Sequence, residues 1–231
     1  TTATTVPSTG MKPSPSFCFA IVATSLLPCS SRAQQAPCRT WQSLASATII
    51  VGPDATVQEH YAAKELSHGL ANLTGLHKPA VHVGQKQSLP IITSPDPTPR
   101  IAVGPSAAAA FGIAAEDIDL AVLGPEGFVA TSNRSAALRN STAGSYVLSG
   151  ARNATHGTLY AVYHLLHALG LRFFAHDCIS AVRACPNAPP TLDDTIHAAL
   201  EFRNMDGWGM QAHPTHAIRL WQNAQGLRLG G

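Results

Sequence analysis

One stretch of the sequence, residues 157–174, constrains the fold of the chain more than any other. Apolar residues recur in its first part at steps of three and four, as on the buried face of a helix: Leu159, Val162, Tyr163, Leu166 and Leu169. Gly170 then supplies a residue suited to the left-handed conformation that ends many helices. We expect a helix that Thr155 or Thr158 caps, followed by a short buried strand over residues 171–175. A helix this apolar needs a sheet to cover it.

The rest of the chain offers the strands of that sheet. Short apolar or β-branched runs, several of them bounded by Gly-Pro or Pro-rich turns, predict strands at residues 47–51, 81–83, 89–93, 100–103, 126–131, 146–149 and 199–202. The capping box Thr56–Glu59 opens a second helix, which closes near Gly75. Because strands outnumber long helices, we expect an α+β fold, with the two main helices on one face of a mostly antiparallel or mixed sheet.

The first 33 residues have the composition of a targeting segment. Met11 reads as the start, Lys12 gives a positive charge, and residues 17–27 form an apolar stretch too short to span a bilayer. Ser31 and Ala33 place small residues before a cleavage point. We expect a signal peptide and secretion. An organelle transit peptide is the alternative, since no acidic residue occurs before position 54.

Removal of that segment leaves Cys38, Cys178 and Cys185. In an oxidising compartment Cys178 and Cys185 are close enough in sequence to pair, with Cys38 left over. A metal site is not expected from these cysteines, because no second Cys or His pair stands at ligand spacing.

Histidine pairs give no better metal signal. His164 and His167, like His213 and His216, are three residues apart and lack the intervening Glu and the third ligand of a zinc helix. We therefore predict no metal and no cofactor.

Four sequons support the secretory route. Asn72, Asn133, Asn140 and Asn153 each stand two residues before Ser or Thr, so we predict them as glycosylation sites. The net charge of +2 and the 12% of charged residues argue against a nucleic-acid partner, because no basic stripe is present. No membrane partner is predicted either.

Five segments of the chain together resemble the N-terminal, non-catalytic domain of the α-glucuronidases of glycoside hydrolase family 67, and more distantly the matching domain of the β-hexosaminidases. They are residues 63–75, with Ala-Lys-Glu-Leu and Leu-Thr-Gly; 101–104, Ile-Ala-Val-Gly; 126–129, Glu-Gly-Phe-Val; 157–163, Gly-Thr-Leu-Tyr-Ala-Val-Tyr; and 169–174, Leu-Gly-Leu-Arg-Phe-Phe. The resemblance covers roughly residues 47–205 and implies a domain over 44–198.

The resemblance extends to the last part of the chain. Residues 199–231 look like the first strand and first helix of a (β/α)8 barrel, which in the family carries the catalysis. A complete barrel needs about 250 residues, so we expect the rest of it to lie outside this chain. The partner of the domain would then be that missing barrel, and the substrate a uronic-acid-bearing plant polysaccharide such as glucuronoxylan.

Catalytic residues cannot be assigned from the acids present. Glycoside hydrolysis needs two facing carboxyl groups, whereas Asp193 and Asp194 are neighbours in an expected loop. Arg172 is expected to pair with a carboxylate at the domain interface. Asp206, at the end of the expected barrel strand, is the one candidate for substrate contact. We predict no hydrolase activity for the chain alone, and the alternative function is a stand-alone secreted module that binds glycan or protein.

Overall fold

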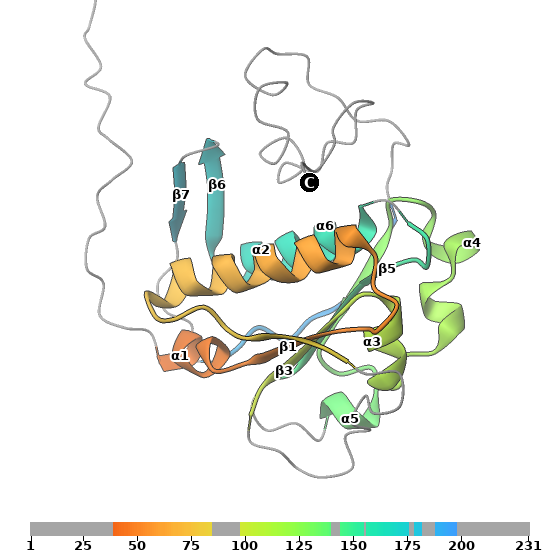
Figure 1. The fold of residues 1–231 in the computed structure, drawn as a ribbon, viewed down its shortest axis with the longest axis horizontal. Coiled ribbons are helices and arrows are strands. Elements are labelled where there is room, and N and C mark those ends of the chain that lie inside the picture. The colour runs from red at the N-terminus through yellow and green to blue at the C-terminus, as the bar shows by residue number, and fades with distance from the viewer. Residues whose placement is uncertain are drawn as a thin grey trace, which may run out of the picture. The chain divides into compact units, whose positions relative to one another are not determined.

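The computed structural model describes residues 39–84, 98–139, 144–154, 156–175, 178–181 and 188–197. All of them lie in one compact unit, Arg32–Gly231. They form a six-stranded mixed sheet covered by helices on both faces (Figure 1). The expected α+β arrangement, with two main helices on one face of a mixed sheet, is confirmed.

The sheet has the strand order β2-β1-β3-β5-β4-β8. Its strands are β1 (Thr48–Val51), β2 (Val81–Val83), β3 (Arg100–Val103), β4 (Phe128–Thr131), β5 (Tyr146–Gly150) and β8 (Asp193–Ile196). The four strands β2, β1, β3 and β5 are parallel, whereas β4 runs antiparallel to both β5 and β8. The parallel strands therefore have their carboxyl ends at the same end of the sheet, at Val51 in β1, Val103 in β3 and Gly150 in β5.

The two long helices share one face of this sheet. Figure 1 shows α2 (Val57–Thr74) and α6 (Gly157–Ala168) side by side across it. Alternate strand residues point to them, and α1 (Arg39–Ala45) joins the same core. The cluster includes Ile49, Val51, Ile101, Val103, Leu148, Leu66, Leu70, Val162 and Leu166, all at most 1% exposed. The predicted apolar face of α6 is therefore the one that packs.

Short helices cover the opposite face. They are α3 (Pro105–Ala110), the 3-10 turn η1 (Ala115–Ile118), α4 (Leu120–Leu123) and α5 (Ala136–Arg139). The second core there contains Ile50, Ala102, Val129 and Val147 from the strands, with Phe111, Ile118, Leu123 and Leu138 above them. Because both faces are buried, β1, β3 and β5 read as continuous apolar runs rather than alternating ones.

The helix boundaries follow their caps, with one exception. Both bonds of the Thr56–Glu59 capping box form, at 3.3 Å and 2.9 Å, and Gly75 ends α2 at a φ of 67°. At α6, by contrast, the Thr158 hydroxyl does not cap the helix. It accepts a hydrogen bond of 2.9 Å from the Gly150 amide and so fixes the start of α6 to the end of β5. Thr155 lies outside the described residues.

Two other expectations are corrected, and one helix has no counterpart among the predicted elements. The predicted strand 171–175 is present as β6 (Leu171–Ala175), but it pairs with β7 (Cys178–Ala181) in a separate hairpin instead of entering the main sheet. Asp193 and Asp194 belong to strand β8 and not to a loop, because the edge of β4 offers their backbone a hydrogen-bonding partner. Helix α1 occupies a segment with no predicted element. The predicted strands 89–93 and 199–202 lie outside the described residues.

Candidate functional site on helix α6

Ionisable side chains gather along one flank of α6. His156, Tyr160 and His164 are spaced by four residues, so they share one side of the helix. His164 Nε2 lies 2.9 Å from Asp194 Oδ2, and its ring is 5.5 Å from that of Phe128. His156 Nδ1 lies 3.3 Å from Glu126 Oε1, and its ring is 5.9 Å from that of Tyr160. We call these five residues, Glu126, His156, Tyr160, His164 and Asp194, the α6 flank site.

The strand pairing explains how the carboxylates reach this flank. Asp194 pairs with Ala130 across the β4–β8 ladder, so its side chain points to the face that α6 covers. Glu126 precedes β4 by two residues. The start of α6 approaches the sheet very closely there, because a Cβ atom at Gly157 would lie 2.3 Å from the Gly127 carbonyl oxygen. This contact between glycines brings His156 within reach of Glu126.

The two histidine–carboxylate pairs differ in burial. The side chains of His156 and Glu126 are 16% and 6% exposed, whereas those of His164 and Asp194 are 23% and 45% exposed. A buried pair is held in a low-dielectric surrounding and is costly to break, while a pair at the rim is screened by water. The Glu126–His156 pair therefore anchors the start of α6 more firmly than the second pair anchors its middle.

The other side of α6 carries a buried polar contact to α2. Tyr163 donates a hydrogen bond of 2.9 Å to Glu65 Oε2, and Glu65 is only 8% exposed. The ring of Tyr163 packs edge-on against Phe173 of β6 at 5.4 Å. The expected burial of Tyr160 and Tyr163 is confirmed, at 1% and 0% exposure.

Arg172 closes the end of α6 in an unexpected way. Its Nη1 donates to the carbonyl oxygens of His167 at 2.7 Å and Leu171 at 2.8 Å, so these contacts are to backbone oxygens rather than to the expected carboxylate. A cation at the carboxyl end of a helix is favourable, because the last carbonyl groups carry partial negative charge. Burial lowers the pKa of His167, and the charges of Arg172 and His164 lower it further.

The spacing of the two carboxylates excludes one chemistry for the α6 flank site. Glu126 lies four residues from the strand position paired with Asp194, which places the two about 13 Å apart along the strand. Their histidine partners are eight residues apart on α6, about 12 Å along its axis. Glycosidase carboxyl pairs stand at roughly 5–9.5 Å. These two carboxylates hold α6 on the sheet and do not form a hydrolytic pair.

A second ionisable group, Glu59, lies at the end of the sheet where the parallel strands have their carboxyl ends. The helix after β1 lies on one face and the helix after β3 on the other, which is the position where open α/β sheets bind ligands. The Glu59 side chain lies at this position, because a Cβ atom on Gly104, just after β3, would be 3.0 Å from the Glu59 carboxyl carbon. Burial raises the pKa of Glu59, although its bond to the Thr56 amide opposes the shift and the charge of Asp54 adds to it.

An open depression of about 590 Å3 lies at the other end of the sheet, beside the start of β5. It is lined by Ser43, Ser132, Asn133, Leu138, Arg139, Gly144, Ser145, Tyr146, Pro189, Pro190 and Thr191. Tyr146 donates to the Pro190 carbonyl at 2.7 Å, and burial raises the pKa of this phenol well above its ordinary value. Arg139 donates to the Asn133 and Arg134 carbonyls at 3.0 Å and 3.2 Å. These bonds stabilise the walls of the depression.

The sites predicted from the sequence are dispersed. Asn72 lies exposed on α2, Asn153 lies exposed in the turn after β5, and Asn133 is half-buried beside Thr131. Cys178 begins β7, but the placement of its side chain is not described. Asn140, Cys185 and Asp206 lie outside the described residues. Those predicted site residues that the structure describes therefore do not come together in one site.

The α6 flank site is not visible in the sequence. His164 stands out there only as a possible metal ligand, and the partners of the two histidines are thirty residues away in each case. Within the described residues, no group of three or more His, Cys, Asp or Glu side chains could hold a metal ion. No helix in the described part of the chain is both long and apolar enough to span a membrane.

Comparison with known proteins leaves the family unassigned. No protein-family model matches the chain, and no curated protein matches it.

Proposed function

We propose that this chain contains the N-terminal, non-catalytic domain of a secreted α-glucuronidase-like glycoside hydrolase. In this proposal residues 44–198 brace a (β/α)8 barrel, residues 199–231 begin that barrel, and the barrel hydrolyses glycosidic bonds in a uronic-acid-bearing plant polysaccharide. Asp206 is the residue of this chain that would contact the substrate. The reaction would need water and no cofactor.

The observation that carries the proposal is the structure of the motif that resembles the glycosidase domain. Its helix α6 is the central helix of the fold: nine of its residues are buried, among them Tyr160 and Tyr163, whereas His164 and His167 are partly exposed. The motif that resembles the glycosidase domain, residues 157–174, forms α6 and β6 in the expected order.

The carboxyl groups give a second line of support. Glu59, Glu65, Glu126, Asp193 and Asp194 each bond to a neighbour within the fold: the Thr56 amide, Tyr163, His156, Arg134 and His164. Groups engaged in this way stabilise a scaffold and are poor candidates for general acid and base. The chemistry is therefore assigned to the barrel.

The length of the native protein tests the proposal. An antibody against residues 157–174 would detect the deglycosylated, denatured protein in extracts, and its mass would be compared with the 24.1 kDa of this chain. We expect a species larger by about 200 residues or more, because a barrel needs about 250. A native species no larger than this chain would overturn the proposal.

Hydrolase activity tests the proposal independently. The purified 231-residue chain should not hydrolyse an aldobiouronic acid, whereas the full-length native protein should. Turnover by the chain alone would contradict its assignment as non-catalytic.

A second candidate function is a stand-alone secreted module that binds glycan or protein. The open depression lined by Ser132, Asn133, Arg139 and Thr191 favours it, because its polar lining could receive a sugar ring. A native mass equal to that of the chain, together with saturable glycan binding lost in Arg139→Ala, would select this function instead.

A further inference from the structure

The segment from residue 60 to residue 82 concentrates basic side chains that the proposed function does not use. It holds His60, His68, His77 and His82, four of the eleven histidines of the chain, together with Lys64 and Lys78. The one acidic residue in the segment is Glu65, which is buried and bonded to Tyr163. The exposed charge of this segment is therefore of one sign.

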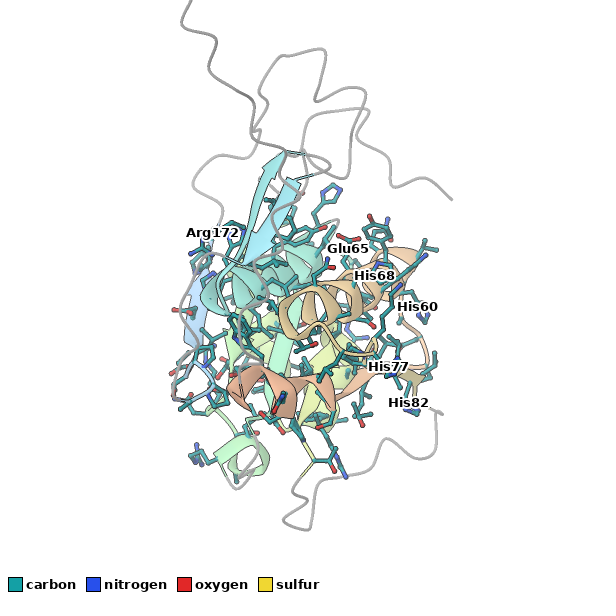
Figure 2. All side chains as sticks on the ribbon, turned by 90° about the vertical axis from the view of Figure 1, so that its left-hand side faces the viewer. His60, Glu65, His68, His77, His82 and Arg172 are labelled. Atoms are coloured by element: carbon teal, nitrogen blue, oxygen red, sulfur yellow. The ribbon has the colours of Figure 1, made fainter. Side chains whose placement is uncertain are left out.

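Five of these residues lie on one side of the molecule. His60, Lys64 and His68 follow each other at four-residue steps along α2, and Lys78 Nζ lies 2.7 Å from His68 Nε2. Figure 2 shows His60, His68 and His77 on the same side of the fold. His82 pairs with Ile50 across the sheet and points to the other face of β2, so it is left out. We call His60, Lys64, His68, His77 and Lys78 the basic face.

The charged groups around the basic face leave the end at His77 and Lys78 positively charged. Glu59 and Asp54 lie at the His60 end, where Glu59 bonds to the Thr56 amide and is also close to Arg152. Of the strands packed against α2, β1 and β7 contain no charged residue, β2 contains His82 and β3 contains Arg100. On the α6 side, Tyr163 contacts Glu65 of α2 and Leu166 lies against Gly69 of α2.

A surface depression lies at this cationic end. It has a volume of about 580 Å3 and is lined by Ala71, Asn72, Gly75, Leu76, His77 and Lys78. It opens where α2 ends and the chain turns back towards β2. A ligand in this depression would contact His77 and Lys78 directly.

The contact between Lys78 and His68 makes the basic face sensitive to pH. A neutral imidazole nitrogen accepts a hydrogen bond from the ammonium group, but a protonated imidazole has only donors. Acidification therefore converts an attraction into a repulsion between two neighbouring cations. An anion that accepts from both groups removes this repulsion, so the protonated face gains affinity for anions.

We propose that the basic face binds a linear, carboxylate-bearing polysaccharide in mildly acidic solution and releases it near neutral pH. The ligand class rests on the proposed function, in which the parent enzyme acts on uronate-bearing polysaccharide. His60, Lys64 and His68 lie along about 12 Å of α2 and the line continues at Lys78, which suits an extended polyanion. Anionic membranes and nucleic acids instead select clusters of permanent Lys and Arg charges, and this face has two lysines.

Binding of polygalacturonate to the full 231-residue chain tests the proposal. Titration calorimetry at low salt would compare about pH 5.5 with about pH 7.5, on either side of the ordinary histidine range. We expect the dissociation constant to be at least about tenfold lower at the acidic pH, and added salt to weaken binding. Methyl-esterified polygalacturonate is the matched ligand control, because it keeps the sugar chain and removes most of the charge.

Variants assign the effect to residues. His60→Gln, His68→Gln and His77→Gln combined should abolish the gain at acidic pH and leave the weak neutral binding unchanged. Lys64→Gln with Lys78→Gln should weaken binding at both pH values. His197→Gln, at an exposed histidine just after β8, should change nothing. Circular dichroism of each variant confirms that it folds.

Several results would overturn the inference: equal affinity at the two pH values, equal affinity for the esterified polymer, or tighter binding to phosphatidylserine vesicles or to a single-stranded oligonucleotide. Its failure is distinguishable from failure of the proposed function. A native protein of barrel length that hydrolyses uronosides, combined with no polygalacturonate binding, sinks only this inference. A native protein without a barrel that still binds polygalacturonate in this way sinks only the proposed function.

Discussion

The hydroxyl of Tyr163 donates a 2.9 Å hydrogen bond to the carboxyl group of Glu65, and both side chains are buried between α6 and α2. This bond is a polar contact within a largely apolar helix pair, in which Gly69 of α2 also lets Leu166 of α6 approach closely. A buried carboxyl group fixes the relative position of two helices because any other packing would leave it with fewer hydrogen bonds. The helical layer is thus specified as well as stabilised.

Removal of the donor should be costly. Tyr163→Phe deletes the hydroxyl and leaves the Glu65 carboxyl without it, so we expect a loss of about 1–3 kcal/mol in the free energy of unfolding. Replacement of both partners, in Tyr163→Phe with Glu65→Met, should cost much less than the sum of the two single changes. Urea unfolding of the four proteins in this double-mutant cycle measures the coupling. Additive effects would show that the bond contributes nothing specific.

Much of this fold could be predicted from the sequence because its main elements are locally determined. The capping box at Thr56 and the glycine at position 75 fix the ends of α2, and the apolar spacing of α6 identifies its buried face. Strands β1 and β3 are buried on both sides, so their apolar runs stand out. In each of these elements local propensity and burial agree.

The remaining elements depend on tertiary context. Residues 193–196 read Asp-Asp-Thr-Ile, which has no strand pattern, yet β4 offers a free edge on which they pair. The α6 flank site depends on the same pairing, because Asp194 reaches His164 only when β8 lies beside β4. Sequence spacing cannot show a contact between side chains thirty residues apart. His164 stands out in the sequence, whereas His156 and the two carboxylate partners required the topology.

Glu59 should make the stability of the fold depend on pH in a particular direction. Burial raises its pKa above the ordinary value of 4.5, so the folded state favours the protonated carboxyl group. The stabilisation associated with this group is present below about pH 4.5 and is lost as the pH rises through the raised pKa. Glu59→Gln keeps the acceptor of the capping box and does not ionise.

The variant should therefore gain stability relative to the wild type as the pH rises from about 4 to about 7. Thermal unfolding of both proteins across that range is the measurement. A difference in melting temperature that stays constant, or that moves in favour of the wild type, would contradict the assignment. Thr56→Ala serves as a control, because it should cost about 1 kcal/mol at every pH through loss of the cap.

The four sequons should differ in glycan occupancy. Asn153 is exposed in a turn at a φ of 63°, a conformation that Asn tolerates better than most residues. Asn133 is half-buried, and its side-chain oxygen accepts a hydrogen bond of 3.3 Å from Thr131. We expect glycan at the exposed Asn153 and little at Asn133.

Peptide mapping by mass spectrometry, after an amidase has converted each occupied Asn to Asp, would measure this in protein from a secreting host. Asn153→Gln should remove one glycan and leave Asn133 as it was. Full occupancy at Asn133 with none at Asn153 would show that the folded exposure of these side chains does not govern modification here.

The close approach of α6 to the sheet gives the sharpest test of the packing. Gly157 begins the helix, and a Cβ atom there would lie 2.3 Å from the Gly127 carbonyl oxygen and 2.9 Å from the Gly150 Cα. Helix propensity alone predicts that Gly157→Ala gains about 1 kcal/mol. Packing predicts the opposite, because the obstructing atoms are backbone and cannot turn aside, and we expect a loss of about 3 kcal/mol.

Gly75→Ala is the matched control, since its Cβ would meet no atom within 4 Å and its cost, about 1 kcal/mol, comes from the left-handed backbone. Urea unfolding should therefore rank wild type above Gly75→Ala and Gly75→Ala above Gly157→Ala. Equal or higher stability of Gly157→Ala would mean that α6 does not sit against Gly127, and the contact that brings His156 to Glu126 would be lost with it.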